Sequence, residues 1–251
     1  MIEPKRILVV GKGGSGKSTI VAAIAKLAVR SVNQVVVVDV DESNPGIERM
    51  LGLNEPSTSL IDAVGGRRQV FGSIKGESSE IVQTTVRRFV EEAKDKDLFL
   101  IRVGKIGEVG SGCACPHGAI SREILAYPFA AGTLVVADSE AGIEHFGRGL
   151  DAKVDTILFI VDPSYNTVEL CQEAKRLADS VGVEFIAVLN KVRNEEVTDF
   201  LKAELSKRAV NVRFVIPYDD SLFMSVLHGK PLEIGPARTP LEELVNEVLS
   251  Q

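Results

Sequence analysis

Short runs of β-branched and aliphatic residues recur along the chain, and most are separated by segments whose apolar residues have a helical spacing. We predict strands at 6–10, 35–38, 98–103, 133–137, 156–161, 185–189 and 212–216. Between the first two runs, apolar residues follow one helical face at 20, 24, 27 and 28. This alternation is typical of βαβ units. We therefore expect an α/β fold: a doubly wound, mostly parallel sheet of roughly seven to eight strands with helices on both faces.

Two further segments have clear helical character. Apolar side chains fall on one face between 81 and 93, directly after Ser78 and Ser79, which are candidates for the helix N-cap. The last helix is expected near Pro240 to Leu249, and its charged residues are Glu242, Glu243 and Glu247. Because no linker or internal repeat divides the sequence, we predict a single domain, 1–251.

Composition and charge narrow the possible partners. Hydrophobic residues make up 45% of the 251 residues, enough for a substantial core, and the formal net charge is −6. A negative balance argues against nucleic acid as a partner, which needs a basic surface. The acidic last helix argues against a membrane surface, and no apolar run approaches the ~20 residues of a membrane span. The first residues do not resemble a signal peptide, so we expect a cytoplasmic protein.

A glycine-rich loop lies between the first predicted strand and the helix that follows it. It matches G-x-x-x-x-G-K-[ST] in the strand–loop–helix context that makes this pattern specific. Glycines let backbone N–H groups approach phosphate oxygens, a lysine adds a point charge, and a hydroxyl can bind Mg²⁺. We predict a site for a nucleoside triphosphate and Mg²⁺ formed by Gly11, Lys12, Gly13, Gly14, Ser15, Gly16, Lys17, Ser18 and Thr19, with Ser18 as the magnesium ligand.

Carboxylates follow two of the predicted strands. Asp39 and Asp41 end the second strand, and Asp138 ends the fourth, with Gly142 shortly after it. At the carboxyl ends of parallel strands such groups lie beside a bound phosphate, where they can hold Mg²⁺ through water or orient an attacking water. Gly142 could bring its backbone N–H close to the terminal phosphate. The alternative is that the aspartates only cap the next segment.

The choice of base can be argued from the residues after the sixth predicted strand. The sequence there is Asn190-Lys191-Val192-Arg193, whereas GTPases have Asp at the last of these positions. Arg193 can only donate hydrogen bonds and cannot accept from guanine. Asn190 has both a donor and an acceptor and can pair with the N6 and N7 edge of adenine. We therefore expect ATP, with Asn190 and Lys191 on the nucleotide.

Two of the three cysteines form Cys113-Ala114-Cys115, after a segment with many glycines. Two thiolates leave half of a tetrahedral metal site empty, but a two-fold homodimer would bring four together, enough for Zn²⁺, Ni²⁺ or an iron–sulfur cluster. The alternative is a pair of incidental thiols. His117 could be a supplementary ligand or a surface residue. Cys171 lies on the apolar face of a predicted helix, which favours core packing.

Lys12 makes the glycine-rich motif G-K-G-G-x-G-K-S-T. The motif resembles the deviant Walker A class of ATPases, which includes the MinD and ParA proteins, nitrogenase iron protein and metal-insertion ATPases. The segments 38–45 and 136–142 resemble switch I and switch II of that class. The resemblance implies that Lys12 crosses a dimer interface to the partner's nucleotide, that Asp41 positions the attacking water, and that Asp39 and Asp138 support the metal.

A narrower resemblance is carried by the segment from Asp138 to Gly149, together with the C-x-C pair and the lysine in the loop. These features look like the CooC-type ATPases, which mature carbon monoxide dehydrogenase by helping nickel enter its active-site cluster. The resemblance implies a nucleotide-dependent homodimer that carries nickel on Cys113 and Cys115 and serves a client such as carbon monoxide dehydrogenase. Many relatives have Val and Thr where this chain has Ser15 and Ser18, but Ser18 keeps the hydroxyl.

Two other functions remain open at this level. A reductase or iron–sulfur carrier similar to nitrogenase iron protein would place a cluster on the same cysteines. A positioning ATPase of the ParA or MinD type would act through DNA or membrane, which the charge of the chain disfavours. His145 and Arg148 could couple the second switch to the metal or client, or lie on a helix surface.

Overall fold

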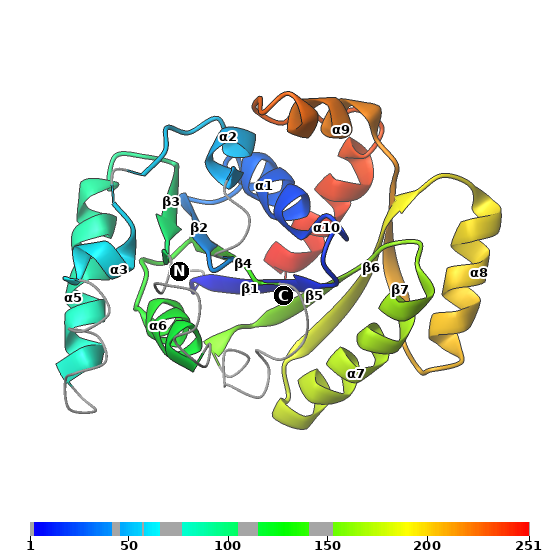
Figure 1. Cartoon of the computed structure of the whole chain (residues 1–251), viewed down its shortest axis with the longest axis horizontal. Coiled ribbons are helices and arrows are strands. Elements are labelled where there is room, and N and C mark those ends of the chain that lie inside the picture. Colours follow the sequence, from blue (N-terminus) through cyan, green and yellow to red (C-terminus); the bar gives the residue numbers. More distant parts are fainter. Residues whose placement is uncertain are drawn as a thin grey trace, which may run out of the picture.

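The computed structural model arranges the chain in three layers, with a parallel sheet between two sets of helices (Figure 1). It describes residues 3–41, 46–56, 58–65, 77–104, 115–140 and 153–250. The strand order within this part of the chain is β3-β2-β4-β1-β5-β6-β7, and all the pairings are parallel. The strands are β1 (Lys5–Gly11), β2 (Gln34–Asp39), β3 (Leu98–Arg102), β4 (Thr133–Asp138), β5 (Thr156–Val161), β6 (Glu184–Val192) and β7 (Val212–Pro217).

Every strand expected from the sequence is present, and the predicted fold class is confirmed. Most bounds agree within a residue; the largest difference is at β6, which continues to Val192. The central strands are buried on both faces, as their continuous apolar runs require. Successive side chains point to opposite faces, so Ile7 and Val9 enter one core while Leu8 and Val10 enter the other.

The helices divide between these two cores (Figure 1). The face that contains Ile7 is covered by α1 (Lys17–Ala28), α2 (Ile47–Leu51), α9 (Asp220–Leu227) and α10 (Arg238–Ser250). The face that contains Leu8 is covered by α3 (Leu60–Ala63), α5 (Glu77–Glu92), α6 (Cys115–Ala126), α7 (Tyr165–Val181) and α8 (Glu195–Ser206). Cys171 of α7 is fully buried in this second core, which confirms its predicted packing role.

One predicted helix start is wrong. Ser78 and Ser79 were expected to precede the helix, but α5 already begins at Glu77 and contains both serines. The Ser79 hydroxyl instead donates to Glu123 of α6, with 2.6 Å between the two oxygens. A serine that finds a partner on a neighbouring helix has no need to cap its own, and sequence spacing does not reveal such a partner.

The strand order brings three functional segments to the same sheet edge. β4 lies between β2 and β1, so the carboxyl end of β1, which opens the glycine-rich loop, is next to Asp138, and Asp138 is paired in register with Asp39. Ligands of doubly wound sheets bind at such an edge, where the connections diverge. No helix in the part of the chain described is long and apolar enough to cross a membrane.

Candidate nucleotide site

The glycine-rich loop takes backbone conformations that require its glycines. Gly11, Gly14 and Gly16 have φ values of +149°, +79° and +96°. A Cβ on Gly11 would lie 2.7 Å from the Ile160 carbonyl oxygen, and a Cβ on Gly16 would lie 2.6 Å from Nδ2 of Asn190. Both contacts are too close for a methyl group. The loop therefore packs directly on β5 and β6.

A cavity of about 600 Å³ opens beside this loop at the amino end of α1. The N-cap of α1 is Gly16, with no capping side chain, so the helix presents backbone N–H groups and the positive end of its dipole at this end. The cavity is lined by Gly13, Gly14, Gly16, Lys17, Ser18, Thr19, Asp41, Gly46, Arg49, Met50, Lys191, Val226 and Gly229. Its size and its N–H donors suit a phosphorylated ligand.

Lys17 is a buried cation beside the loop, with 6% of its surface exposed. Burial lowers the pKa of its ammonium group, while Asp138, Asp41 and Glu140 act in the opposite direction. Its Nζ donates to the Lys12 carbonyl oxygen at 3.4 Å. The structure thus brings together Lys17 and the two carboxylates that the sequence predicted on separate segments.

Asp138 is 1% exposed, and burial raises its pKa to about 7 although a hydrogen bond from Ser18 and the charge of Lys17 lower it. One of its carboxylate oxygens has no hydrogen-bond partner among the described residues. An unpartnered buried oxygen next to a serine hydroxyl fits a hard cation such as Mg²⁺, which prefers oxygen ligands and keeps several waters. Ser18 would bind the ion directly and Asp138 would hold one of its waters.

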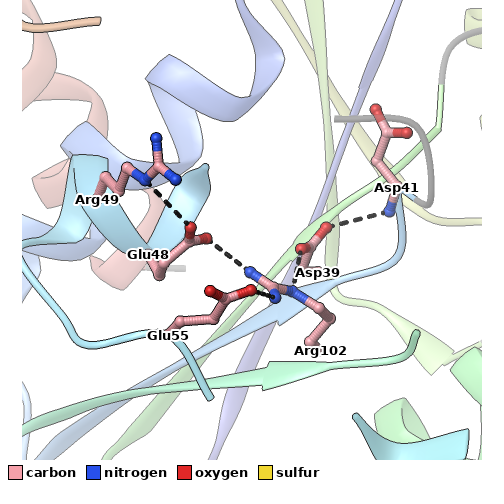
Figure 2. A network of polar contacts seen from close by, with 6 residues as sticks. All are labelled: Asp39, Asp41, Glu48, Arg49, Glu55 and Arg102. Atoms are coloured by element: carbon pink, nitrogen blue, oxygen red, sulfur yellow. Dashed lines mark hydrogen bonds and ion pairs between the residues drawn. The ribbon is translucent and has the colours of Figure 1, made fainter. Parts of the chain in front are cut away.

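Asp39 is engaged differently. Its Oδ1 accepts the Asp41 N–H at 3.2 Å, and its Oδ2 accepts Nε of Arg102 at 3.4 Å (Figure 2). Burial raises the pKa of Asp39 to about 6, and Arg102 limits this rise. Both carboxylate oxygens of Asp39 thus have partners, the Asp41 backbone and Arg102 on β3. The role of Asp39 beside the metal stays a prediction. The Asp41 carboxylate points away from this group in Figure 2, and Asp41 lines the cavity.

Lys12 is held by a residue at the start of α7. Its Nζ donates to Oγ of Ser164 at 3.2 Å. Ser164 is the N-cap residue of α7, and its hydroxyl also contacts Asp162 and Thr167, each at 2.7 Å. No local pattern in the sequence connects these residues with Lys12. In the single chain Lys12 therefore contacts the N-cap residue of α7, and its reach to a partner subunit stays a prediction.

Asn190 and Lys191 support the loop from β6. Nδ2 of Asn190 donates to the Ser15 carbonyl oxygen at 2.9 Å, and Nζ of Lys191 donates to the Gly14 carbonyl oxygen at 2.7 Å. One of the two N–H groups of the Asn190 amide is therefore already in use, and a contact of this residue with adenine stays a prediction. The Arg193 guanidinium stacks on the Tyr218 ring, 3.8 Å from its centroid.

Several predicted site residues lie outside the part of the chain that the structure describes. These are Gly142, Cys113, His145 and Arg148, together with the side chains of Cys115 and His117. The backbone of Cys115 begins α6. Within the described residues there is no group of three or more His, Cys, Asp or Glu side chains that could hold a metal. The predicted metal site on the cysteine pair therefore remains a prediction.

The site has a glycine-rich loop between β1 and α1, with a lysine and a hydroxyl at the start of α1. Carboxylates lie at the ends of the adjacent strands. This combination defines a P-loop nucleotide-binding protein. Residues 7–232 match the family described as the CobQ/CobB/MinD/ParA nucleotide binding domain. The chain belongs to this family and is a P-loop ATPase.

Individual relatives agree with this assignment. An ATP-binding protein of Methanocaldococcus jannaschii is 33% identical over 238 residues, which cover 90% of this chain and 93% of that protein. The carbon monoxide dehydrogenase accessory protein CooC of Rhodospirillum rubrum is 27% identical over 209 residues, 78% of each chain. The septum site-determining protein MinD of Pyrococcus horikoshii, solved with Mg-ADP, is similar in fold, with a TM-score of 0.67, 16% identity and coverage of 98% and 96%.

Proposed function

We propose that the protein is a homodimeric ATPase that uses ATP hydrolysis to insert nickel into carbon monoxide dehydrogenase or a related nickel enzyme. The metal is cargo, held by Cys113 and Cys115 of two subunits. The observation that carries the metal part is the C-x-C pair, whose second cysteine begins α6, in a chain that is 27% identical to CooC. The ATPase part of the proposal is supported by the sequence motif, the fold and the nucleotide site.

The position of α6 supports this proposal. α6 begins at Cys115, and the preceding strand, β3, ends at Arg102 on the same sheet edge as the nucleotide cavity. Two thiolates cannot complete a tetrahedral site, so the metal needs a second copy of the chain. A nucleotide that changes how two subunits meet would then also change the metal site.

The described residues support the following nucleotide chemistry. The loop N–H groups and Lys17 would bind the phosphates, and Asp41 would orient a water. Ser18 and Asp138 would hold Mg²⁺, which would neutralise charge on the phosphate oxygens. Water attacks the γ-phosphorus, the bond from that phosphorus to the bridging oxygen breaks, and ADP and inorganic phosphate are released. Lys12 leaves Ser164 to reach the partner's phosphate, so the ATP state favours the closed dimer and hydrolysis loosens it.

The test is metal analysis of the purified protein after loading with Ni²⁺. We expect about one Ni²⁺ per dimer in the wild type, because four thiolates form one tetrahedral site. Cys113→Ser and Cys115→Ser should each lose it. Cys171→Ala is the matched control, since this thiol is buried in the core and should leave the metal content unchanged. Equal nickel in all four proteins would overturn the cysteine site.

The same samples distinguish nickel insertion from the alternative function, a reductase or iron–sulfur carrier. A protein purified without oxygen that is brown, with broad visible absorption and with iron and sulfide bound through Cys113 and Cys115, would carry an iron–sulfur cluster instead of nickel. Dimerisation is followed in parallel by analytical ultracentrifugation with no nucleotide, with ADP and with a non-hydrolysable ATP analogue. If neither the metal content nor the association changed among these states, the coupling between ATP and metal would be wrong.

A further inference from the structure

Arg49 of α2 lines the nucleotide cavity together with two other cations, Lys17 and Lys191. Those two already donate to carbonyl oxygens of the glycine-rich loop, Lys191 at 2.7 Å and Lys17 at 3.4 Å. In the described part of the chain, the carboxylate near the Arg49 guanidinium is that of Glu48, 3.8 Å from Nε and beyond hydrogen-bond distance. The N–H donors of Arg49 therefore remain available to a ligand.

The position of Arg49 follows from the packing of α2. Ile47, Met50 and Leu51 are buried in the same core as the apolar face of α1. The Met50 carbonyl oxygen also accepts the Leu232 N–H at 2.9 Å, which ties α2 to the segment after α9. Arg49 is left on the exposed face of the helix, with 67% of its side chain accessible. It thus reaches the cavity from a helix that is itself held in place.

The far end of the Arg49 side chain lies against the turn after α9. A Cβ built on Gly229 would be 3.7 Å from the NH1 nitrogen of Arg49 and 3.8 Å from its Cδ, which are ordinary van der Waals distances. Gly229 and Val226 of α9 line the same cavity as Arg49. The guanidinium therefore lies between the walls that α2 and the end of α9 give to this cavity.

The carboxylate beside Arg49 is held by a different arginine. Oε2 of Glu48 lies 2.6 Å from the NH2 nitrogen of Arg102, the last residue of β3, while Oε1 faces Arg49 at 3.8 Å (Figure 2). The Glu48 side chain is 3% exposed, so its close pair with Arg102 is little screened by water. Because Arg102 balances the charge of Glu48, Arg49 is not committed to a tight ion pair of its own.

We propose that Arg49 is a further nucleotide-binding residue, whose guanidinium donates hydrogen bonds to phosphate oxygens of ATP. A guanidinium presents its N–H donors in a rigid plane and can bind a phosphate through two parallel hydrogen bonds. Charge favours this ligand, since the described cavity lining carries three cations and one carboxylate, that of Asp41. Arg49 approaches the phosphates from α2, while the loop and Lys17 hold them from α1. The inference concerns the ATPase site alone and does not depend on the proposed nickel function.

The experiment is calorimetric titration with a non-hydrolysable ATP analogue and Mg²⁺, at low and at physiological ionic strength. Arg49→Gln should weaken binding by roughly 5- to 30-fold at low ionic strength, as expected for the loss of a hydrogen bond to a charged group at an exposed site. The loss should be smaller at physiological ionic strength, because salt screens exposed charges. Arg49→Lys keeps the charge and should lose less than about threefold.

The matched control is Arg88→Gln. Arg88 is also an exposed arginine whose Nε lies 3.8 Å from a glutamate, Glu92, but it belongs to α5 and does not line the cavity. The substitution removes the same charge from the protein and should keep the wild-type affinity at both ionic strengths.

Three results would overturn the inference: wild-type affinity in Arg49→Gln, an equal loss in Arg49→Lys or in Arg88→Gln, or a loss in Arg49→Gln that does not depend on ionic strength. The last result would assign the effect to packing instead of charge. A wild type that does not bind the analogue would instead refute the ATP site itself.

Discussion

Replacing Asp138 with asparagine should stabilise the protein in the absence of nucleotide, and more so as the pH rises. Burial raises the pKa of Asp138 from its ordinary value of 3.8 to about 7. Between these two values the folded chain binds more protons at this site than the unfolded chain does. The contribution of Asp138 to stability therefore falls as pH rises through this window and reaches its minimum above the folded pKa. Asparagine is neutral throughout and escapes this loss.

The size of the effect follows from the same shift. Each pKa unit corresponds to about 1.4 kcal/mol, so the full rise corresponds to roughly 4 kcal/mol at about pH 8. Two of these units lie between about pH 5 and 7, and relaxation around a buried charge reduces such values. The difference in unfolding free energy between Asp138→Asn and wild type should therefore widen by about 1–3 kcal/mol from pH 5 to pH 8. The pKa of about 7 already includes the attraction between the Asp138 carboxylate and Lys17, so losing this attraction is part of the stated change.

The assay is urea unfolding of both proteins at several pH values in this range, without nucleotide and with a chelator present. Asp179→Asn is the control: this carboxylate is 58% exposed and pairs with Lys175 on the surface of α7. Its effect should be small at each pH. A difference for Asp138→Asn that is flat with pH, or that narrows toward pH 8, would refute the reasoning. Because the substitution also removes the candidate holder of a magnesium-bound water, the more stable protein should hydrolyse ATP poorly.

Two further predictions concern the loop. Gly16→Ala should weaken ATP binding by about tenfold or more, because it combines a positive φ with a clash against Asn190, whereas Gly14→Ala meets only the positive φ and should lose less affinity. Calorimetric titration with ATP measures both affinities, and two equal, undiminished affinities would contradict the explanation. Lys12→Ala should abolish the association induced by the non-hydrolysable ATP analogue while the monomer still binds nucleotide, whereas Ser164→Ala should preserve that association. Sedimentation measures the association of both variants. A dimer that survives the loss of Lys12 would exclude the predicted role of this residue.

Local sequence patterns sufficed for the strands and for the position of the glycine-rich loop. The strands are short runs of valine, isoleucine and leucine that have to be buried on both faces, so their positions could be read directly. The loop from Gly11 to Thr19 carries its own conformational requirement in its glycines. These features depend on neighbours along the chain, and that is why the sequence reveals them.

Contacts between distant segments were not predictable in this way. Arg102 lies 63 residues from Asp39 and 54 from Glu48, and nothing in the local pattern distinguishes it from a surface arginine. The same holds for Lys12 and Ser164, which are 152 residues apart. Such pairs follow from strand order, which the alternation of strands and helices leaves open. The metal role of Cys113 and Cys115 remains a prediction, because their side chains lie outside the residues that the structure describes.

The support that β6 gives to the glycine-rich loop also affects how tightly nucleotide can bind. The Ser15 carbonyl oxygen is fixed toward β6 by Asn190. In a trans peptide the C=O and N–H groups point in opposite directions, so the N–H of Gly16 is turned away from β6 before any ligand arrives. Little conformational freedom is then left to lose on binding, and the loop is preorganised for its ligand. Differences among the nucleotide states of this protein should therefore arise outside this loop, which stays the same.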